Sequence, residues 1–352
     1  MKSESDYLDE LRALHDREWP RGLTREPYQP FGHLPLSDIL ARWTELQPDK
    51  TAIDFYGAGL SYRWLHEYST RLAWLLHAQG VEKGDRIAVF MPNCPQYLLA
   101  FFGILKLGAI LVPVNPMFRE AELRHELNDT GARLIIAADT LLPLVRSVMP
   151  DTELATIVVT SPGELAPAQP DVPLPQVLRE AKDDPADAID LMKELEGIEN
   201  GIDLTGRATL DDIAVINYTG GSTGLPKGCV HTQGHMVYTA STTVPMALQL
   251  ERDSHYLCVL PVFWMAGEVF GIIFPIYAGA SVSLLTRWDA ETAMHTIQHR
   301  GVTHTTLLVD GLVEIMQHPN LANHDLRGLR HVQGVSFVKK LNTGFRDRWR
   351  EI

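Results

Sequence analysis

A glycine- and hydroxyl-rich segment directly follows an apolar, β-branched run and is well suited to chemistry. Residues 218–228 read YTGGSTGLPKG. Glycines let backbone N–H groups approach anionic oxygens, hydroxyl groups add donors, and a lysine adds a cation. The segment therefore predicts a loop that binds the phosphates of ATP, with the candidate ligands Thr219, Gly220, Gly221, Ser222, Thr223, Gly224 and Lys227.

Two common nucleotide-binding patterns do not fit this segment. A P-loop needs a lysine followed by serine or threonine, whereas Lys227 lies between Pro226 and Gly228. The spacing is not that of G-x-G-x-x-G either. The remaining alternative is a glycine-rich hairpin turn without a ligand.

Composition indicates a globular protein that does not bind nucleic acids in general. Of the 352 residues, 45% are apolar and 21% charged, and the net charge is −13. A general nucleic-acid binder needs clustered lysine and arginine. The charge is concentrated in residues 163–212, which hold thirteen acidic and four basic residues. The apolar stretch 98–114 is too short to span a bilayer, and residues 1–22 are too charged for a signal peptide. We expect a soluble, cytoplasmic protein without a transmembrane segment.

A few isolated residues allow other chemistry. The three cysteines form no CxxC pair, which suits a reducing compartment, and Cys229 directly follows the glycine loop as a candidate reactive thiol. His231 and His235 are spaced like a metal-binding pair on a helix, but the sequence indicates no third ligand.

Short β-branched runs alternate with helical patterns, which predicts an α/β protein with parallel sheets. Helices are expected from Ser61 to about Gly80, over 95–107 and over 120–128. The expected strands are 52–56, 86–91, 110–114, 134–138, 156–160, 213–218, 256–260, 281–285 and 305–309.

The sequence also predicts a division into segments. Residues 161–209 are acidic and proline-rich, and we interpret them as a solvated, mobile connection with one short helix near 187–195. The predicted units are an N-terminal extension 1–35, a first α/β half 36–160, the connection 161–209, and a second α/β half 210–352.

Several ordered motifs together resemble the adenylate-forming (AMP-binding) enzymes, the superfamily of acyl-CoA synthetases and luciferases. The loop is similar to Y-T-S-G-T-T-G-x-P-K-G, with Gly220 for serine and Ser222 for threonine. The stretches Leu60-Ser-Tyr, 80–89, 103–116 and 122–132 resemble earlier family motifs in the same order. The resemblance implies the N-terminal domain of that family, with two stacked αβα subdomains, incomplete at the C-terminus.

A later motif bears on the substrate. Residues 260–267 read LPVFWMAG and stand where many CoA ligases have P-x-F-H-x-x-G. Amino-acid-activating relatives have an aspartate where Trp264 stands, so an amino-acid substrate is disfavoured. In some long-chain acyl-CoA synthetases a tryptophan here gates the acyl tunnel, which makes Trp264 and Gly267 candidate substrate residues. The alternative is that Trp264 is a core residue.

The resemblance implies an acyl-CoA synthetase that converts a carboxylic acid, ATP and coenzyme A into acyl-CoA through acyl-AMP. We expect a medium- or long-chain fatty acid, with Mg²⁺ held through ATP near Thr223. An aryl or short-chain acid is one alternative, and a non-catalytic remnant that binds nucleotide or acyl groups is another.

The motifs Y-G-x-T-E and the catalytic lysine of the family do not occur after residues 325–338, which resemble the preceding strand. We therefore expect an incomplete N-terminal part that holds no complete set of catalytic residues and is inactive alone. Strand edges left uncovered would favour low solubility or a homodimer.

Overall fold

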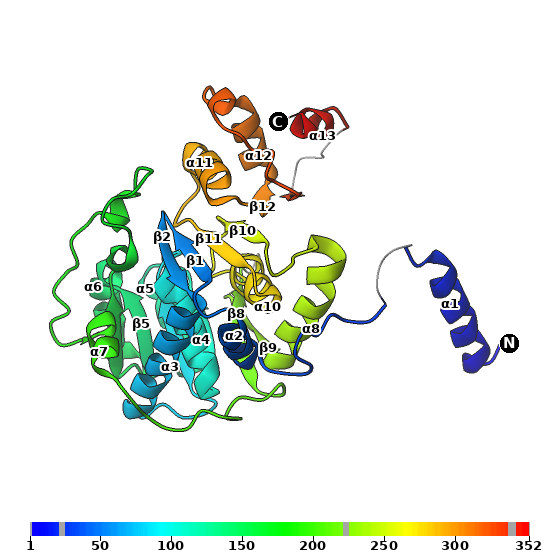
Figure 1. Cartoon of the computed structure of the whole chain (residues 1–352). Coiled ribbons are helices and arrows are strands. Elements are labelled where there is room, and N and C mark those ends of the chain that lie inside the picture. Colours follow the sequence, from blue (N-terminus) through cyan, green and yellow to red (C-terminus); the bar gives the residue numbers. More distant parts are fainter. Residues whose placement is uncertain (1, 21–24, 221–224, 337–342, 352) are drawn as a thin grey trace.

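Two β-sheets organise the chain in a computed structural model, which describes residues 2–20, 25–220, 225–336 and 343–351 (Figure 1). The first sheet has the order β7 (Ile189–Asp190), β6 (Thr156–Thr160), β5 (Leu134–Ala138), β3 (Arg86–Phe90), β4 (Ile110–Val114), β8 (Ile213–Thr219), β9 (Lys227–Thr232). The second has the order β13 (His331–Val335), β12 (His304–Leu308), β10 (His255–Cys258), β11 (Ser281–Leu284), β1 (Thr51–Phe55), β2 (Ala58–Ser61).

Helices form layers around these sheets. Helices α3 (Tyr62–Ala78) and α4 (Pro95–Leu107) pack on each other between the sheets, α3 against β1 and β2, and α4 against β3 and β4. Every residue of α4 is buried, which explains why its sequence is apolar apart from Gln96 and Lys106. The outer faces are covered by α5 (Glu120–Thr130) and α6 (Leu142–Val148) on one side and by α11 (Ala290–Arg300) and α12 (Val309–Gln317) on the other. The expected α/β architecture of two stacked αβα units is confirmed.

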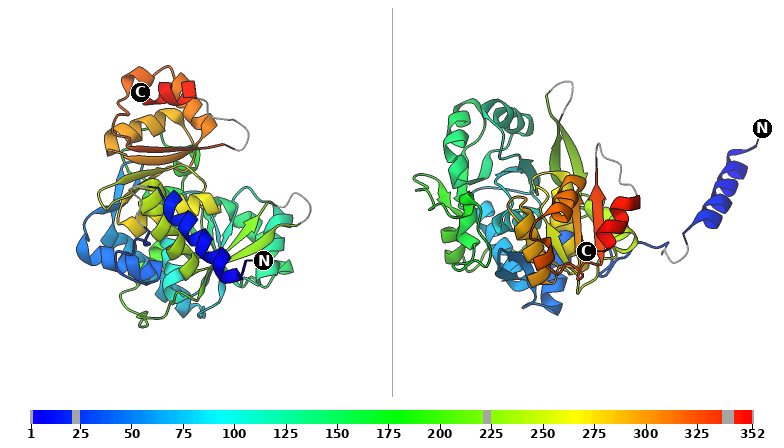
Figure 2. Two further views of the ribbon diagram at one scale, coloured as in Figure 1. Left: turned by 90° about the vertical axis from the view of Figure 1, so that its right-hand side faces the viewer. Right: turned by 90° about the horizontal axis from the view of Figure 1, so that it is seen from above.

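The remaining helices lie around this frame. They are α1 (Glu4–Glu18), α2 (Leu36–Leu46), α7 (Leu191–Gly197), α8 (Gln233–Thr243), α9 (Met265–Glu268), α10 (Phe274–Ala278) and α13 (Thr343–Arg350). Helix α1 buries none of its residues and projects away from the body (Figures 1 and 2). Over the described ranges, no helix has the length and apolar character needed to cross a membrane.

The two sheets do not coincide with the predicted sequence halves. Strands β1 and β2 come from the first half but lie in the second sheet, whereas β8 and β9 come from the second half but complete the first sheet. The halves 36–160 and 210–352 therefore divide the sequence and not the fold, because long-range strand pairing is invisible to local pattern.

Residues 161–209 are mostly exposed or half-buried and include the short helix expected near 187–195 as α7, but part of the segment is packed on the fold. Strand β7 pairs in parallel with β6, and Val172, Leu178, Leu191 and Leu195 are buried. The Trp74 indole also donates a 2.9 Å hydrogen bond to the carbonyl oxygen of Ile202. These apolar residues are too widely spaced to give a periodic signal, so the acidic and proline content dominated the interpretation.

Candidate functional site

The carboxyl ends of strands from both sheets meet at one buried side chain. Asn93, three residues beyond β3, donates hydrogen bonds of 2.9 Å and 3.0 Å to the carbonyl oxygens of Leu260 and Leu285. Its amide oxygen accepts a 2.8 Å bond from the backbone N–H of Val262. Those partners follow β10 and β11. In each sheet the strand order reverses at this point, which is where open α/β sheets commonly bind ligands.

The described residues on either side of the predicted phosphate loop are the two strands of a β-hairpin at this edge. Strands β8 and β9 pair in antiparallel register, with Thr219 opposite Lys227 and Tyr218 opposite Gly228. A Cβ atom at Gly228 would lie 2.7 Å from Cγ2 of Ile216, so only glycine permits this close crossing. Strand β9 was not expected from the sequence, because most of its residues are exposed and carry no apolar alternation.

Three of the predicted phosphate ligands lie on the described parts of the hairpin. Thr219 and Gly220 are exposed, and no atom lies within 4 Å of a Cβ built on Gly220. Lys227 is exposed and has no ion-pair partner among the residues with assigned positions, so its charge is available to an anion. The other predicted ligands lie outside the described residues: Gly221, Ser222, Thr223 and Gly224.

Helix α5 contacts the hairpin close to the predicted phosphate loop. The hydroxyl of Tyr218 donates a 2.5 Å hydrogen bond to Oδ2 of Asp129. Nε2 of His125 lies 3.0 Å from the carbonyl oxygen of Pro226, which can only accept. Sequence reasoning missed both α5 residues, although they lie in the stretch 122–132 that resembles a family motif. Helix α5 is mostly polar, so the polarity of these two residues does not distinguish them in the sequence.

The face of the hairpin opposite to the side chain of Tyr218 carries a row of side chains, here called the stripe, that leads away from the loop. Side chains directly opposite each other in an antiparallel pair share a face. The stripe therefore consists of three cross-strand pairs in order from the tip: Thr219 with Lys227, Asn217 with Cys229, and Val215 with His231. Thr219 and Val215 are about 13 Å apart at the usual rise of a strand.

At its far end this stripe enters a cavity of about 100 Å³. The cavity lies between the hairpin, α8 and the helical segment that begins with α9. Its exposed rim includes His235, Thr239 and Met265. Its other lining residues are partly or fully buried and mainly apolar: Val215, His231, Met236, Glu268, Val269, Ile273 and Phe274.

Glu268 is the acidic group in this lining and is 0% exposed. Its Oε2 accepts a 3.5 Å contact from the amide of Asn217, whereas Oε1 has no hydrogen-bond partner among the residues described. Burial raises the pKa of Glu268 to about 8, and the Asn217 contact opposes this shift. Glu268 could not be singled out from the sequence, since it follows the recognised motif by one residue.

The two predicted substrate residues lie beside the cavity and not in its lining. Trp264 precedes α9, is 49% exposed and packs edge-on against Phe263, so it is not a core residue. Gly267 is buried, and a Cβ there would lie 2.0 Å from the carbonyl oxygen of Pro261. Gly267 thus allows α9 to pack tightly enough to place Met265 and Glu268 at the cavity.

The histidine pair does not form a metal site in the described chain. His231 is the penultimate residue of β9 and His235 belongs to the first turn of α8, with their ring centroids 6.3 Å apart. Over the placed residues, no three metal-ligating side chains gather anywhere. The predicted Mg²⁺ contact, Thr223, lies outside the described residues.

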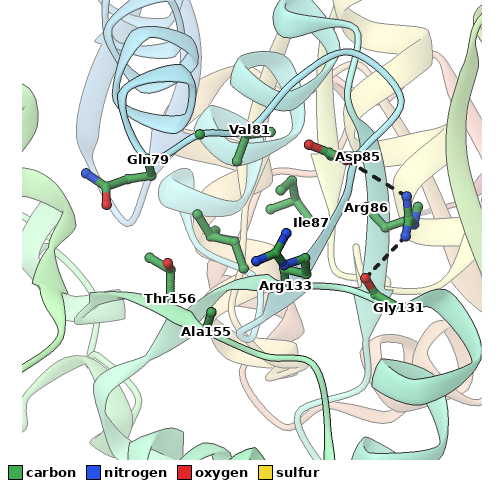
Figure 3. Close-up of a pocket in the computed structure, with 11 residues that line it drawn as sticks. Gln79, Val81, Asp85, Arg86, Ile87, Gly131, Arg133, Ala155 and Thr156 are labelled. Atoms are coloured by element: carbon green, nitrogen blue, oxygen red, sulfur yellow. Dashed lines mark hydrogen bonds and ion pairs between the residues drawn. The ribbon is translucent and has the colours of Figure 1, made fainter.

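Another pocket, of about 270 Å³, lies at the amino ends of β3, β5 and β6 (Figure 3). Arg86 and Arg133 line it, but Arg86 is already bound to the carbonyl oxygens of Thr130 and Gly131. Because the pocket is at the sheet edge opposite the hairpin, it takes no part in the candidate site.

Comparisons with known proteins agree with the family motifs. A sequence model of the family described as AMP-binding enzyme matches residues 40–352. A long-chain-fatty-acid–CoA ligase of Bacillus subtilis is 28% identical over 319 residues, covering 89% of this chain and 57% of that protein. The 4-coumarate–CoA ligase 3 of Arabidopsis thaliana is 26% identical over 305 residues, covering 85% of this chain and 50% of that protein.

The fold is shared with solved structures. The crystal structure of an anthranilate CoA ligase in complex with anthranoyl-AMP superimposes with a TM-score of 0.76 at 24% identity, covering 91% of this chain and 58% of that one. The present chain thus spans little more than half the length of these relatives.

Proposed function

The chain belongs to the AMP-binding enzyme family. From this premise we propose that its function is that of an ATP-dependent carboxylic acid–CoA ligase. In the proposed reaction, a carboxylate oxygen attacks the α-phosphorus of ATP and pyrophosphate leaves. The thiol of coenzyme A then attacks the acyl carbon and AMP leaves. The observation that carries the proposal is the continuous stripe from the open glycine hairpin to the apolar cavity.

The described residues suit the two ends of such a substrate pair. Thr219, Gly220 and Lys227 offer a hydroxyl, an open backbone and an uncompensated cation to phosphate oxygens. The apolar lining of the cavity suits the hydrocarbon part of an acid. We propose that Mg²⁺ arrives with ATP, because the described residues offer no cluster of metal ligands.

Two classes of acid remain as proposals. A medium- or long-chain fatty acid is supported by the similarity to the Bacillus subtilis ligase. The cavity volume of about 100 Å³ is smaller than the roughly 150 Å³ that holds one benzene ring, so it favours a short-chain acid. Within the alternative of an aryl or short-chain acid, we adopt the short-chain acid on this ground.

We also propose a cytoplasmic location. Cys94, Cys229 and Cys258 are all free thiols, which suits a reducing compartment.

The proposal is tested by calorimetric titration of this chain with ATP and with acyl sulfamoyl adenosines, which are stable mimics of acyl-AMP. We expect the mimics to bind more tightly than ATP, because they fill both ends of the stripe. Lys227→Ala should weaken ATP binding by about tenfold or more, the loss of one charge-assisted hydrogen bond. Lys193→Ala, an exposed lysine on α7, is the matched control and should change nothing.

Acid-dependent exchange of labelled pyrophosphate into ATP would support adenylation directly. Formation of ADP instead of AMP, or mimics that bind no better than ATP, would contradict the proposed function.

A further inference from the structure

The lining of the cavity includes a side chain with an unsatisfied polar atom. Oε1 of Glu268 is buried without a hydrogen-bond partner in the described part of the chain, on a side chain that lines the cavity. Most buried polar atoms in folded proteins are hydrogen-bonded, so an exception calls for a reason. An apolar side chain of similar size would avoid the cost of burying this carboxyl group.

The position of Glu268 suggests what its partner is. Asn217, which contacts Oε2, belongs to the stripe that begins at the glycine hairpin. A ligand that extends from the hairpin along this stripe reaches the cavity beside Glu268. The free oxygen then faces the part of the ligand farthest from the phosphates.

Resting on the ligase function proposed above, we propose that the substrate acid carries a hydroxyl or amino group remote from its carboxyl group, and that Glu268 binds it. Glu268 is then a specificity-determining residue that selects a polar-tailed acid over a plain hydrocarbon acid. The cavity volume of about 100 Å³ admits a short chain with such a group.

The chemistry of Glu268 suits both kinds of group. With its raised pKa the carboxyl group is largely protonated at neutral pH and both donates and accepts hydrogen bonds. A hydroxyl or a neutral amino group also does both. A plain methyl or phenyl end would leave Oε1 unpaired and forfeit this interaction.

A second buried group near Glu268 offers a competing explanation. The hydroxyl of Tyr97 on α4 also lacks a partner among the described residues, and its pKa is raised chiefly by burial and further by the nearby Glu268. A water molecule bound between the two would satisfy both without any substrate group. The experiment below separates this outcome.

The test measures the affinity of matched acyl sulfamoyl adenosines for this chain by calorimetry. One set carries benzoyl, para-hydroxybenzoyl and para-aminobenzoyl groups, and a second carries hexanoyl and its hydroxyl-terminated counterpart. We expect the wild type to bind at least one polar member about tenfold more tightly than its plain partner. Glu268→Leu should reverse that preference, and Glu268→Gln should retain part of it. Glu194→Leu, an exposed glutamate on α7, is the matched control.

Equal affinity for plain and polar members overturns the inference while leaving the ligase function standing. If Glu268→Leu still binds the polar analogues more tightly than the plain ones, the inference is overturned as well, because another residue then binds the polar group. The partner of Oε1 would in that case be a buried water molecule. If the wild type binds no adenosine analogue, the ligase function fails and this inference fails with it. Folding is checked by thermal unfolding, in which Glu268→Leu should be at least as stable as the wild type, because it removes a buried unpaired carboxyl group.

Discussion

The side chain of Asn93 donates a 2.9 Å hydrogen bond to the carbonyl oxygen of Leu260 and so ties one sheet to the other. Together with its contacts to Leu285 and Val262, this amide satisfies three backbone groups just beyond the carboxyl ends of two strands, β10 and β11. The loop after β10, which leads into α9, is therefore positioned by a residue about 170 positions earlier in the chain.

Replacing Asn93 should strongly destabilise the fold. Asn93→Ala leaves three backbone groups without their partner, and we expect a loss of roughly 2–4 kcal/mol in the free energy of unfolding. Asn93→Asp keeps the acceptor but loses both donors, so it should also destabilise. Chemical denaturation measures both. Asn128→Ala, which removes a single exposed contact to Asp151, should cost under about 1 kcal/mol, and equal losses at the two sites would refute the argument.

Tyr218→Phe tests how α5 supports the hairpin. The substitution removes only the hydroxyl that binds Asp129, and we expect a loss of about 1 kcal/mol in stability because the contact is partly exposed. Nucleotide affinity should fall severalfold, since the base of the loop is less well fixed. Tyr238→Phe, at an exposed position on α8, is the control. Unchanged affinity for ATP in Tyr218→Phe would show that the α5 contact does not position the loop.

Much of the fold could be predicted from the sequence because its signals are local. Strands such as β3 to β6 are continuous buried runs, and α4 ends at Gly108 in the left-handed conformation that glycine favours. All nine predicted strands are present, with ends that differ by a residue or two. Strands β2, β7 and β9 were missed because they are short or exposed edge strands without an apolar alternation.

The site could be predicted only where one segment supplies several groups. The hairpin residues are consecutive, so Thr219 and Lys227 could be named from the loop alone. By contrast, Asn93, Asp129 and Glu268 come from separate elements and act through contacts that only the tertiary structure creates. Gly267 was named for the substrate, but its evident structural role is close packing against Pro261.

Gly267→Ala should disturb the site through packing. The added Cβ would lie 2.0 Å from the carbonyl oxygen of Pro261, which requires α9 to move. We expect a loss of at least about 2 kcal/mol in unfolding free energy, together with weaker binding of the acyl sulfamoyl adenosines. Gly197→Ala is the matched control, because a Cβ at that helical position meets no atom within 4 Å. It should be neutral or slightly stabilising. A Gly267→Ala protein as stable as Gly197→Ala would contradict the packing role.

The pH dependence of stability should report the burial of Glu268. Burial raises the pKa of its carboxyl group in the folded protein to about 8 from an ordinary value of 4.5. Between these values the unfolded chain loses the proton while the folded chain keeps it. Ionisation therefore favours unfolding, and the stability that Glu268 provides at low pH is lost as the pH rises through about 8.

Glu268→Gln removes this titration and isolates its effect from that of other groups, such as Glu126, whose pKa is also raised to about 8 by burial. The stability of the wild type minus that of Glu268→Gln should fall by about 1.4 kcal/mol per pH unit across the middle of this range. Urea denaturation of both proteins at a series of pH values measures the difference. A difference that stays flat from pH 5 to 8 would mean that Glu268 is solvated or paired in the folded protein, and its carboxyl group would then need no partner from the substrate.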